Sequence, residues 1–162
     1  MSKKACIFLD RDGVVNRERG DHTYDINDFV INDGLFEGLL KLKEHQFIFI
    51  IVTNQSGIAL NKYTEEQMHA CHQKLIDEAQ SYDIEFKAIY FCPHHPDISR
   101  CLCRKPDSLL LEKAIDTFDI DPLKSWFIGD RQRDTDAAVK AGVKPLLIKS
   151  NQNINEVLHL IL

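Results

Sequence analysis

The chain has 162 residues, of which 44% are hydrophobic and 28% are charged, and its formal net charge is −5. This length and composition suit one globular domain with its own core, and we expect a single domain over residues 1–162. The acidic balance argues against binding to a nucleic-acid backbone, which needs a basic face, but it allows a small phosphorylated substrate in a locally basic pocket.

The start of the chain and the cysteines favour a cytoplasmic protein. The apolar run before Asp10 is too short for a signal peptide, and no stretch is long and apolar enough to span a membrane. The five cysteines are odd in number and three of them are clustered, which favours a reduced compartment and a metal site over a disulfide framework. We expect a monomer with neither a membrane nor a nucleic-acid partner.

Apolar runs alternate with helical patterns along the whole chain. In order, the predicted elements are a strand at 4–9, a loop or hairpin at 13–33, a helix at 35–45, a strand at 47–52, a helix at 64–82, a strand at 86–91, a loop at 92–106, a helix at 107–118, a strand at 125–128, a helix at 134–141, a strand at 145–148 and an amphipathic helix at 154–161. Such alternation indicates an α/β, Rossmann-like fold with a mainly parallel sheet and helices on both faces.

Polar residues follow four of the predicted strands at their carboxyl ends. They are Asp10 and Asp12 after the first strand, Thr53 and Asn54 after the second, Cys92 and His94 after the third, and Asp130 after the fourth. Ligands of parallel α/β sheets bind beyond the carboxyl ends of the strands, so these clusters are expected to share one site.

Asp10 and Asp12 stand in the segment Asp10-Arg11-Asp12-Gly13. A carboxylate held at the end of a buried strand can attack phosphorus and form an acyl phosphate. A second carboxylate two residues on can protonate the leaving oxygen and then activate water. In isolation the pattern is also compatible with a strand-end turn that carries two solvated acids.

Asp130 follows a buried strand in the segment Phe127-Ile128-Gly129-Asp130. Mg²⁺ prefers oxygen ligands, so Asp10 and Asp130 with one backbone carbonyl would suffice to bind it. Asp130 could also cap the helix that follows, and Asp134 is either a supporting carboxylate of the site or a plain helix N-terminal acid.

Two further segments offer groups for a phosphate. Thr53, Asn54, Gln55 and Ser56 supply a hydroxyl, amides and backbone N–H groups after the second strand. Arg104 and Lys105 supply cations, with Lys105 expected to pair with Asp10 and the transferring phosphoryl group, and Arg104 to bind substrate. A pair of basic residues can equally be a solvated surface.

Residues 92–103 contain three cysteines and two histidines within a dozen residues. Cys92, His94, Cys101 and Cys103 would complete a tetrahedral Zn²⁺ shell, with His95 as the alternative nitrogen ligand. A full shell predicts a structural zinc that holds Arg104 and Lys105 in place. Cys6 and Cys71 are predicted to be core residues, and His69 and His72 to lie on a helix surface.

Taken together, Asp10-x-Asp12, Thr53, Lys105 and Gly129-Asp130 resemble the haloacid-dehalogenase (HAD) phosphatases, subfamily IIIA. The zinc loop is similar to that of the bacterial branch that holds heptose-bisphosphate and histidinol-phosphate phosphatases. The resemblance covers residues 5–148 and implies no cap domain, the loop at 17–28 and the zinc loop framing the pocket instead.

The resemblance also implies roles for individual residues. Asp10 would be the nucleophile and Asp12 the general acid/base, Thr53 and Lys105 would bind the phosphoryl group, and Asp10, the Asp12 carbonyl and Asp130 would hold Mg²⁺. The residues expected to bind substrate are Asn54, Gln55, Ser56, Arg104, Lys105 and Arg131.

The substrate implied by the resemblance is a small phosphate ester of carbohydrate metabolism. The segments 52–59 and 92–96 look like the heptose enzymes, whereas the six residues between His94 and Cys101 are closer to the shorter zinc loop of the histidinol-phosphate enzymes. A phosphotransferase, a mutase and a non-catalytic zinc-stapled binding module are the alternatives of other classes.

Overall fold

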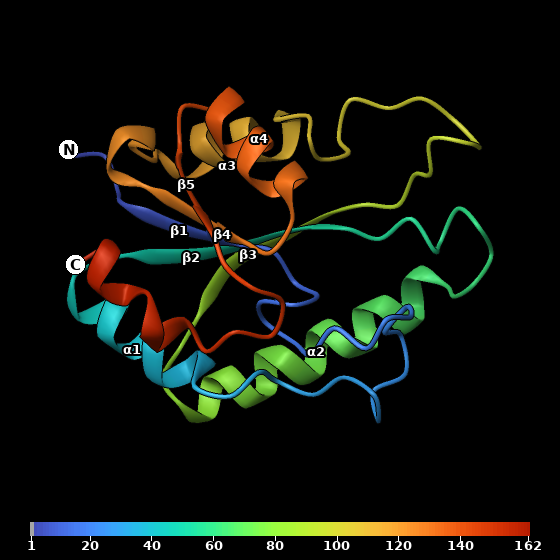
Figure 1. The fold of residues 1–162 in the computed structure, drawn as a ribbon, viewed down its shortest axis with the longest axis horizontal. Helices are drawn as coiled ribbons and strands as arrows, with labels where there is room; N and C mark the ends of the chain where they lie inside the picture. The colour runs from blue at the N-terminus through green and yellow to red at the C-terminus, as the bar shows by residue number, and fades with distance from the viewer. Residues whose placement is uncertain (1) are drawn as a thin grey trace.

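A computed structural model describes residues 2–162, which form a five-stranded sheet between two layers of helices (Figure 1). All neighbouring strands are parallel, in the order β3-β2-β1-β4-β5. The elements are β1 (Cys6–Leu9), α1 (Leu35–Glu44), β2 (Ile48–Asn54), α2 (Glu65–Ser81), β3 (Phe86–Cys92), α3 (Leu109–Phe118), η1 (Pro122–Lys124), β4 (Trp126–Gly129), α4 (Gln132–Lys140), β5 (Lys144–Leu147), η2 (Ile154–Glu156) and η3 (Leu158–Leu160).

The predicted α/β fold with a parallel sheet is confirmed. Figure 1 shows α1 and α2 on one face of the sheet and α3 and α4 on the other. Within residues 2–162 no segment forms a separate cap, and no helix is long and apolar enough to cross a membrane.

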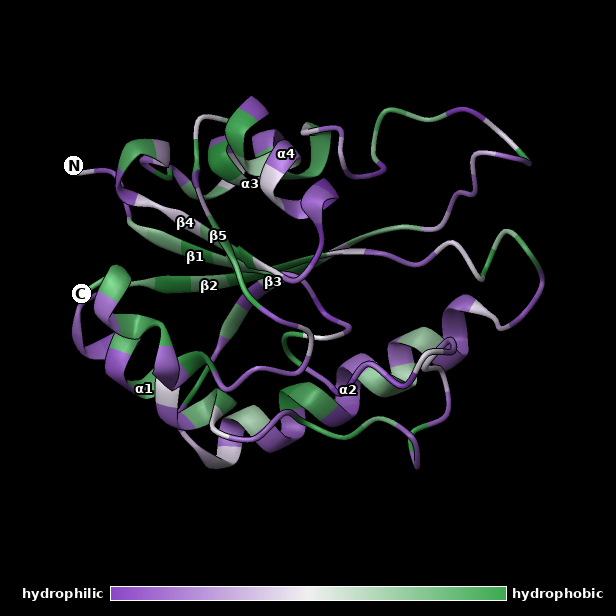
Figure 2. Cartoon of the chain, viewed as in Figure 1, coloured by the Kyte–Doolittle hydropathy of each residue, from purple (hydrophilic) through white to green (hydrophobic). Residues whose placement is uncertain are grey.

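The central strand β1 is buried on both of its faces because side chains alternate along a strand. Ile7 and Leu9 pack in a core with residues of α1 and α2, whereas Cys6 and Phe8 pack in a second core with residues of α3 and α4. None of the four is exposed. Figure 2 shows hydrophobic residues along the strands and on the inner faces of the helices. Because β1 has a core on each face, it is apolar at every position.

The strand order brings the ends of β1 and β4 together. From β1 the chain moves outward to β2 and β3, and it then returns to place β4 on the other side of β1. Such a reversal is a topological switch point, where open α/β sheets bind their ligands. Asp10 follows β1 and Asp130 follows β4, and the Asp10 backbone nitrogen donates to the Ile128 carbonyl at 3.1 Å.

One predicted helix was wrong in type, and another begins slightly earlier than predicted. The segment predicted as a helix at 154–161 forms the two 3₁₀ turns η2 and η3. The Asn153 side chain accepts from the Asn155 nitrogen, a local bond that tightens the segment, and the Asn155 side chain donates to the Gly34 carbonyl, which ties the segment to the start of α1. Helix α4 begins at Gln132, two residues before the predicted start at 134.

Candidate active site

Asp10 lies on the floor of the site and is paired with a buried lysine. Lys105 is only 1% exposed, and its Nζ donates to Asp10 Oδ1 at 2.9 Å and to the Val52 carbonyl at 2.8 Å. It also forms an ion pair with Asp134 Oδ1 at 2.7 Å. Lys105 therefore fixes one oxygen of Asp10 and neutralises part of the charge of two buried carboxylates.

The ionisation of this pair depends on its burial. Burial raises the pKa of Asp10 to about 7; Lys105 opposes this shift and the neighbouring Asp134 adds to it. Although burial alone would lower it, Asp10 and Asp134 hold the pKa of Lys105 above its ordinary value. Lys105 thus stays charged, whereas Asp10 needs a further cation to be fully ionised below neutral pH.

Asp12 is held from both sides by hydrogen bonds. Its Oδ1 accepts from Arg11 Nη2 at 2.9 Å and from Asn16 Nδ2 at 3.0 Å, and its Oδ2 accepts from Gln55 Nε2 at 3.1 Å. Although burial favours protonation, Arg11 and then Asn16 and Gln55 hold the pKa of Asp12 below its ordinary value. The carboxylate borders the pocket in a single, defined orientation.

The segment after β2 divides into residues that border the pocket and residues that lie beneath it. Asn54, Gln55 and Ser56 border the pocket, whereas Thr53 is 1% exposed and does not. The Gln55 amide nitrogen also donates to Thr53 Oγ1 at 2.9 Å, and its amide oxygen accepts from the Tyr63 hydroxyl. The polar groups of Gln55 are thus occupied by protein partners.

Asn54 fastens the segment that carries Arg104 and Lys105 to the end of β2. Its Nδ2 donates to the Lys105 carbonyl at 3.1 Å, and its Oδ1 accepts from the Lys105 backbone nitrogen at 3.1 Å. This pair of bonds explains how residues 51 positions apart reach the same edge of the sheet. Arg104 then borders the pocket, while Lys105 points below it to Asp10.

The carboxylates at the strand ends fit a divalent cation. Carboxylate oxygens of Asp10, Asp130 and Asp134 lie within 4.8 Å of one another, and neither oxygen of Asp130 has a hydrogen-bond partner among residues 2–162. A buried carboxylate without a hydrogen-bond partner is unfavourable unless cations balance its charge, and Arg131 Nε lies 3.8 Å from Asp130 Oδ2. Both oxygens of Asp134 have protein contacts, with Lys105 Nζ and with the Arg131 nitrogen, whereas the contacts of Asp10 are on Oδ1, so Asp10 and Asp130 offer the freer oxygens to a cation.

Glycine is required at position 13 beside this group. Gly13 has a φ of +88°, and a Cβ there would overlap the carboxylate of Asp130. The backbone after Asp12 therefore approaches Asp130 more closely than any other residue type would allow. The residue that caps α4 is Arg131 rather than Asp130, so the carboxylate of Asp130 is not used for capping.

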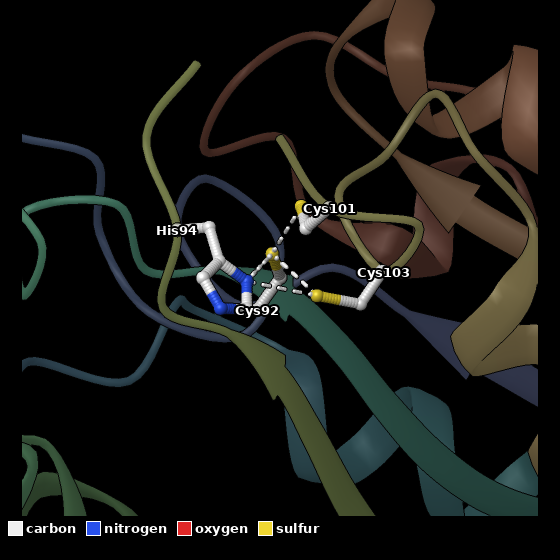
Figure 3. A group of neighbouring side chains, drawn as sticks. All are labelled: Cys92, His94, Cys101 and Cys103. Carbon is white, nitrogen blue, oxygen red and sulfur yellow. Dashed lines mark hydrogen bonds between the residues drawn. The ribbon is translucent and has the colours of Figure 1, made fainter. Parts of the chain in front are cut away.

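The cysteine and histidine side chains of the zinc loop converge on one point (Figure 3). Ligand atoms of Cys92, His94, Cys101 and Cys103 lie within 4.8 Å of one another, with His94 Nδ1 3.2 Å from Cys103 Sγ. The alternative His95 lies outside this group, and its Nδ1 accepts from the Asp97 nitrogen. Three sulfurs and one ring nitrogen are a donor set that suits zinc. The remaining cysteines, Cys6 and Cys71, are buried core residues as predicted.

The pocket above Asp10 has a volume of about 390 Å³ and mostly polar walls. Three arginines line it, Arg104 from the zinc loop and Arg131 and Arg133 from the start of α4. The loop at 17–28 contributes Glu18, Gly20, Asp21, His22 and Thr23. Sequence reasoning missed Arg133 and Tyr63, because neither belongs to a motif and only the fold brings them to the pocket.

A second buried cluster lies beside the pocket, around Arg11. His72 was predicted to lie on a helix surface, and this was wrong: it is 5% exposed, and its Nε2 lies 3.4 Å from Arg11 Nη1. Burial, followed by the charge of Arg11, lowers the pKa of His72 to about 3, so the ring stays neutral. The signal was present, since Met68, His72 and Leu75 lie at helical spacing on the buried stripe of α2.

One switch point of the sheet thus brings together four charged side chains. They are a buried carboxylate after β1, a second acid two residues later, a lysine from a distant loop and a carboxylate after β4. This arrangement is that of a phosphatase with a HAD fold. A family model described as HAD-hydrolase-like matches residues 102–159, which covers the zinc-loop end, α3, β4, α4 and β5.

Comparison with known proteins narrows the class. The chain is 36% identical over 163 residues to D-glycero-beta-D-manno-heptose-1,7-bisphosphate 7-phosphatase of Haemophilus ducreyi, covering 95% of this chain and 87% of the relative. It is 37% identical over 150 residues to D-glycero-alpha-D-manno-heptose-1,7-bisphosphate 7-phosphatase of Campylobacter jejuni, covering 93% and 85%. The chain therefore belongs to the family of HAD-superfamily phosphatases that contains these heptose enzymes.

A solved structure of the same family supports the assignment. D,D-heptose 1,7-bisphosphate phosphatase from B. bronchiseptica, complexed with magnesium and phosphate, superposes with a TM-score of 0.85 at 29% identity. The match covers 96% of this chain and 86% of that chain. The chain is thus a phosphatase whose relatives include a magnesium-bound structure.

Proposed function

We propose that this phosphatase removes the 7-phosphate of D-glycero-D-manno-heptose 1,7-bisphosphate, a precursor of surface-glycan heptose. The observation that carries the proposal is the polar pocket over Asp10, with Arg104, Arg131 and Arg133 on its walls. A bisphosphate presents one phosphate to Asp10 and leaves a second anionic group for the arginines. The heptose relatives, which match nearly the whole chain, support the same substrate.

The proposed reaction has two steps. Asp10 attacks phosphorus and forms an acyl phosphate, while Asp12 protonates the departing sugar oxygen. Asp12 then accepts a proton from water as the water attacks the acyl phosphate, which releases phosphate and restores Asp10. Lys105 holds Asp10 in position during both steps. Thr53 and Lys105, predicted to bind the phosphoryl group, are buried beneath the pocket and support it through Gln55 and Asp10, and the predicted substrate-binding residues that border the pocket hold the rest of the ester.

We further propose that Asp10, the Asp12 carbonyl and Asp130 hold Mg²⁺. When bound, the ion would offset the repulsion between the anionic nucleophile and the phosphate. The buried carboxylate of Asp130, which accepts no hydrogen bond, and the magnesium in the B. bronchiseptica relative support this.

Magnesium is expected to stabilise the protein more at pH 8 than at pH 5. The pKa of Asp10 is raised in the folded state, so without metal this group favours folding while it is protonated, and that contribution is lost as the pH rises from about 4 to about 7. The metal binds the ionised form, so it restores stability mainly at the higher pH. Thermal unfolding with Mg²⁺ and with excess chelator measures the difference in Tm. An equal difference at both pH values would contradict the ligand role of Asp10.

We also propose that Cys92, His94, Cys101 and Cys103 bind one structural zinc. Metal analysis of reduced protein is expected to find about one zinc per chain, and Cys101→Ser to lose most of it. Because Arg104 and Lys105 directly follow Cys103, the same variant is expected to lose activity as the loop loosens. Cys71→Ala, a buried cysteine outside the cluster, serves as the control and should keep its zinc. A full zinc content in Cys101→Ser would remove the site.

The substrate is tested by comparing kcat/KM on the alpha and beta anomers of the heptose bisphosphate and on histidinol phosphate. The proposal expects at least about tenfold preference for one heptose anomer, since histidinol phosphate has no second phosphate for the arginines. Preference for histidinol phosphate would identify the alternative enzyme of histidine biosynthesis. No turnover of any ester by metal-loaded protein would favour the non-catalytic binding module.

The last proposals concern the oligomeric state and the cellular compartment of the enzyme. We propose that it acts as a monomer, because residues of one chain supply every group in the proposed mechanism. Its five cysteines are all free, which is consistent with a reducing compartment such as the cytoplasm. Sedimentation of the metal-loaded protein would test the monomer.

A further inference from the structure

Arg11 is a buried cation that the proposed chemistry does not use. It is 0% exposed and is among the largest fully buried side chains, yet it does not border the pocket. Burying a guanidinium is unfavourable unless its donors are paired, so its surroundings must be organised to receive it. What it binds therefore indicates why it is present.

The Arg11 guanidinium joins Asp12 to the pocket loop at 17–28. Nη2 donates both to Asp12 Oδ1 at 2.9 Å and to the Thr23 carbonyl at 2.8 Å, and Nε lies 3.3 Å from the same Asp12 oxygen. On its other edge Nη1 meets the neutral ring of His72. The guanidinium carbon lies 5.5 Å from the centre of the Phe29 ring. These contacts hold the planar group in one orientation.

A second chain of contacts connects the same loop to the other oxygen of Asp12. Tyr24 stacks on Tyr63 with ring centres 5.2 Å apart, Tyr63 donates to the Gln55 oxygen, and the Gln55 nitrogen donates to Asp12 Oδ2. Each carboxylate oxygen of Asp12 thus has one path of contacts to the loop, and Oδ1 also accepts from Asn16 Nδ2 at 3.0 Å. Residues 18 and 20–23 of that loop line the pocket, so they meet whatever substrate enters it.

We propose that Arg11 is a positioning residue that couples the substrate-lining loop at 17–28 to the orientation of Asp12. With the loop held at Thr23, Arg11 Nε and Nη2 hold Asp12 Oδ1, and Oδ2, which accepts one bond from Gln55, keeps a lone pair for the proton that passes to the leaving oxygen. Displacement of the loop withdraws the Thr23 carbonyl and releases Asp12 from that orientation. The proposal rests on the proposed function of Asp12 as the general acid.

The test compares leaving groups in Arg11→Lys and Arg11→Met. A sugar phosphate needs a proton from Asp12 as its oxygen departs, whereas an aryl phosphate such as 4-nitrophenyl phosphate does not. For both esters kcat/KM reports events up to the formation of the acyl phosphate on Asp10. Both variants are expected to lose kcat/KM about tenfold or more beyond their loss on the aryl ester, because general acid catalysis contributes about 10²–10⁴-fold. Equal losses on the two esters would overturn the proposal.

Lys74→Met tests the loop side of the coupling. Lys74 fastens the end of this loop to α2, through bonds of 2.8 Å to the carbonyls of Ile26 and Phe29, and it does not touch Asp12. Its removal loosens the loop, so the loss on the sugar phosphate should exceed the loss on the aryl ester while Arg11 is present, and the excess should be smaller in the Arg11→Lys background. An excess of the same size with and without Arg11 would overturn the coupling through Arg11.

Combining Arg11→Lys with Asp12→Asn gives a second readout. If Arg11 acts through Asp12, the double variant should be no slower on the sugar phosphate than Asp12→Asn alone, whereas independent roles would multiply the losses. Arg11→Lys keeps the buried charge, so it decides the matter if Arg11→Met does not fold. If the unmodified protein hydrolyses the aryl ester but not the heptose bisphosphate, only the proposed substrate is refuted. Another alkyl phosphate that the protein hydrolyses would then replace the heptose bisphosphate in this test.

Discussion

Asp10→Asn is expected to lower kcat by roughly 10⁴-fold or more, because an amide oxygen cannot form the acyl phosphate through which the proposed reaction passes. The fold should persist. The Oδ1 atom of the substituted side chain can still accept from Lys105 Nζ and from the Arg11 backbone nitrogen, the two bonds that Asp10 Oδ1 accepts now. Steady-state kinetics on the heptose bisphosphate, with a thermal melt beside it, measures both effects.

Two controls make this result decisive. Asp116→Asn makes the same chemical change on the exposed side of α3 and should leave kcat unchanged. Mass spectrometry must show that the introduced asparagine has not deamidated back to aspartate. Activity within tenfold of the unmodified enzyme would exclude Asp10 as the nucleophile, and unfolding of the variant would instead show that its charge supports the fold.

Lys105→Met should damage both stability and turnover. Removing the ammonium leaves Asp10 and Asp134 as two buried carboxylates without their shared cation, which costs about 3–5 kcal/mol. Without Lys105 the pKa of Asp10 rises further, because the cation that opposes the shift is gone. Asp10 then stays protonated up to a higher pH, which disfavours metal binding and nucleophilic attack over a wider range of pH. Turnover should fall by about 10²–10³-fold, the usual cost of one lost electrostatic contact in a dry site.

The pH dependence of the stability of Lys105→Met distinguishes loss of a shared counter-ion from a simple packing defect. Repulsion between Asp10 and Asp134 requires both to be ionised, so the loss of stability should be larger at pH 8 than at pH 5. Adding Asp134→Asn should recover part of the stability without recovering activity. Lys113→Met, an exposed lysine on α3, is the matched control. A loss of stability independent of pH would contradict the role of Lys105 as a shared counter-ion.

The fold was largely predictable, because the spacing of apolar residues indicates the helices and continuous apolar runs indicate the buried strands. The run at 5–9 is apolar at every position since β1 has a core on each face, and this signal needs no tertiary information. The helix predicted at 154–161 failed because its apolar spacing is also compatible with 3₁₀ turns. What decides between them is the contact of Asn155 with Gly34, far away in sequence.

The candidate site was predictable where residues directly follow strands. Asp10 and Asp130 could be placed together because parallel strands end at a common edge. Residues outside this rule were missed or misplaced: Arg133 reaches the pocket from the first turn of α4, and Arg11 turns away from the pocket into a cluster with His72. The direction of a side chain within a motif depends on what packs against it, and the motif alone does not contain that information.

The two hydrogen bonds between Asn54 and the backbone of Lys105 have an evolutionary consequence. Together with the proposed zinc site, they anchor Lys105 from outside the stretch of chain between His94 and Cys101. Insertions or deletions in that stretch can therefore accumulate without moving Lys105 relative to Asp10. The loop is free to change length and so reshape the pocket mouth, which gives one unchanged reaction centre a route to new substrates.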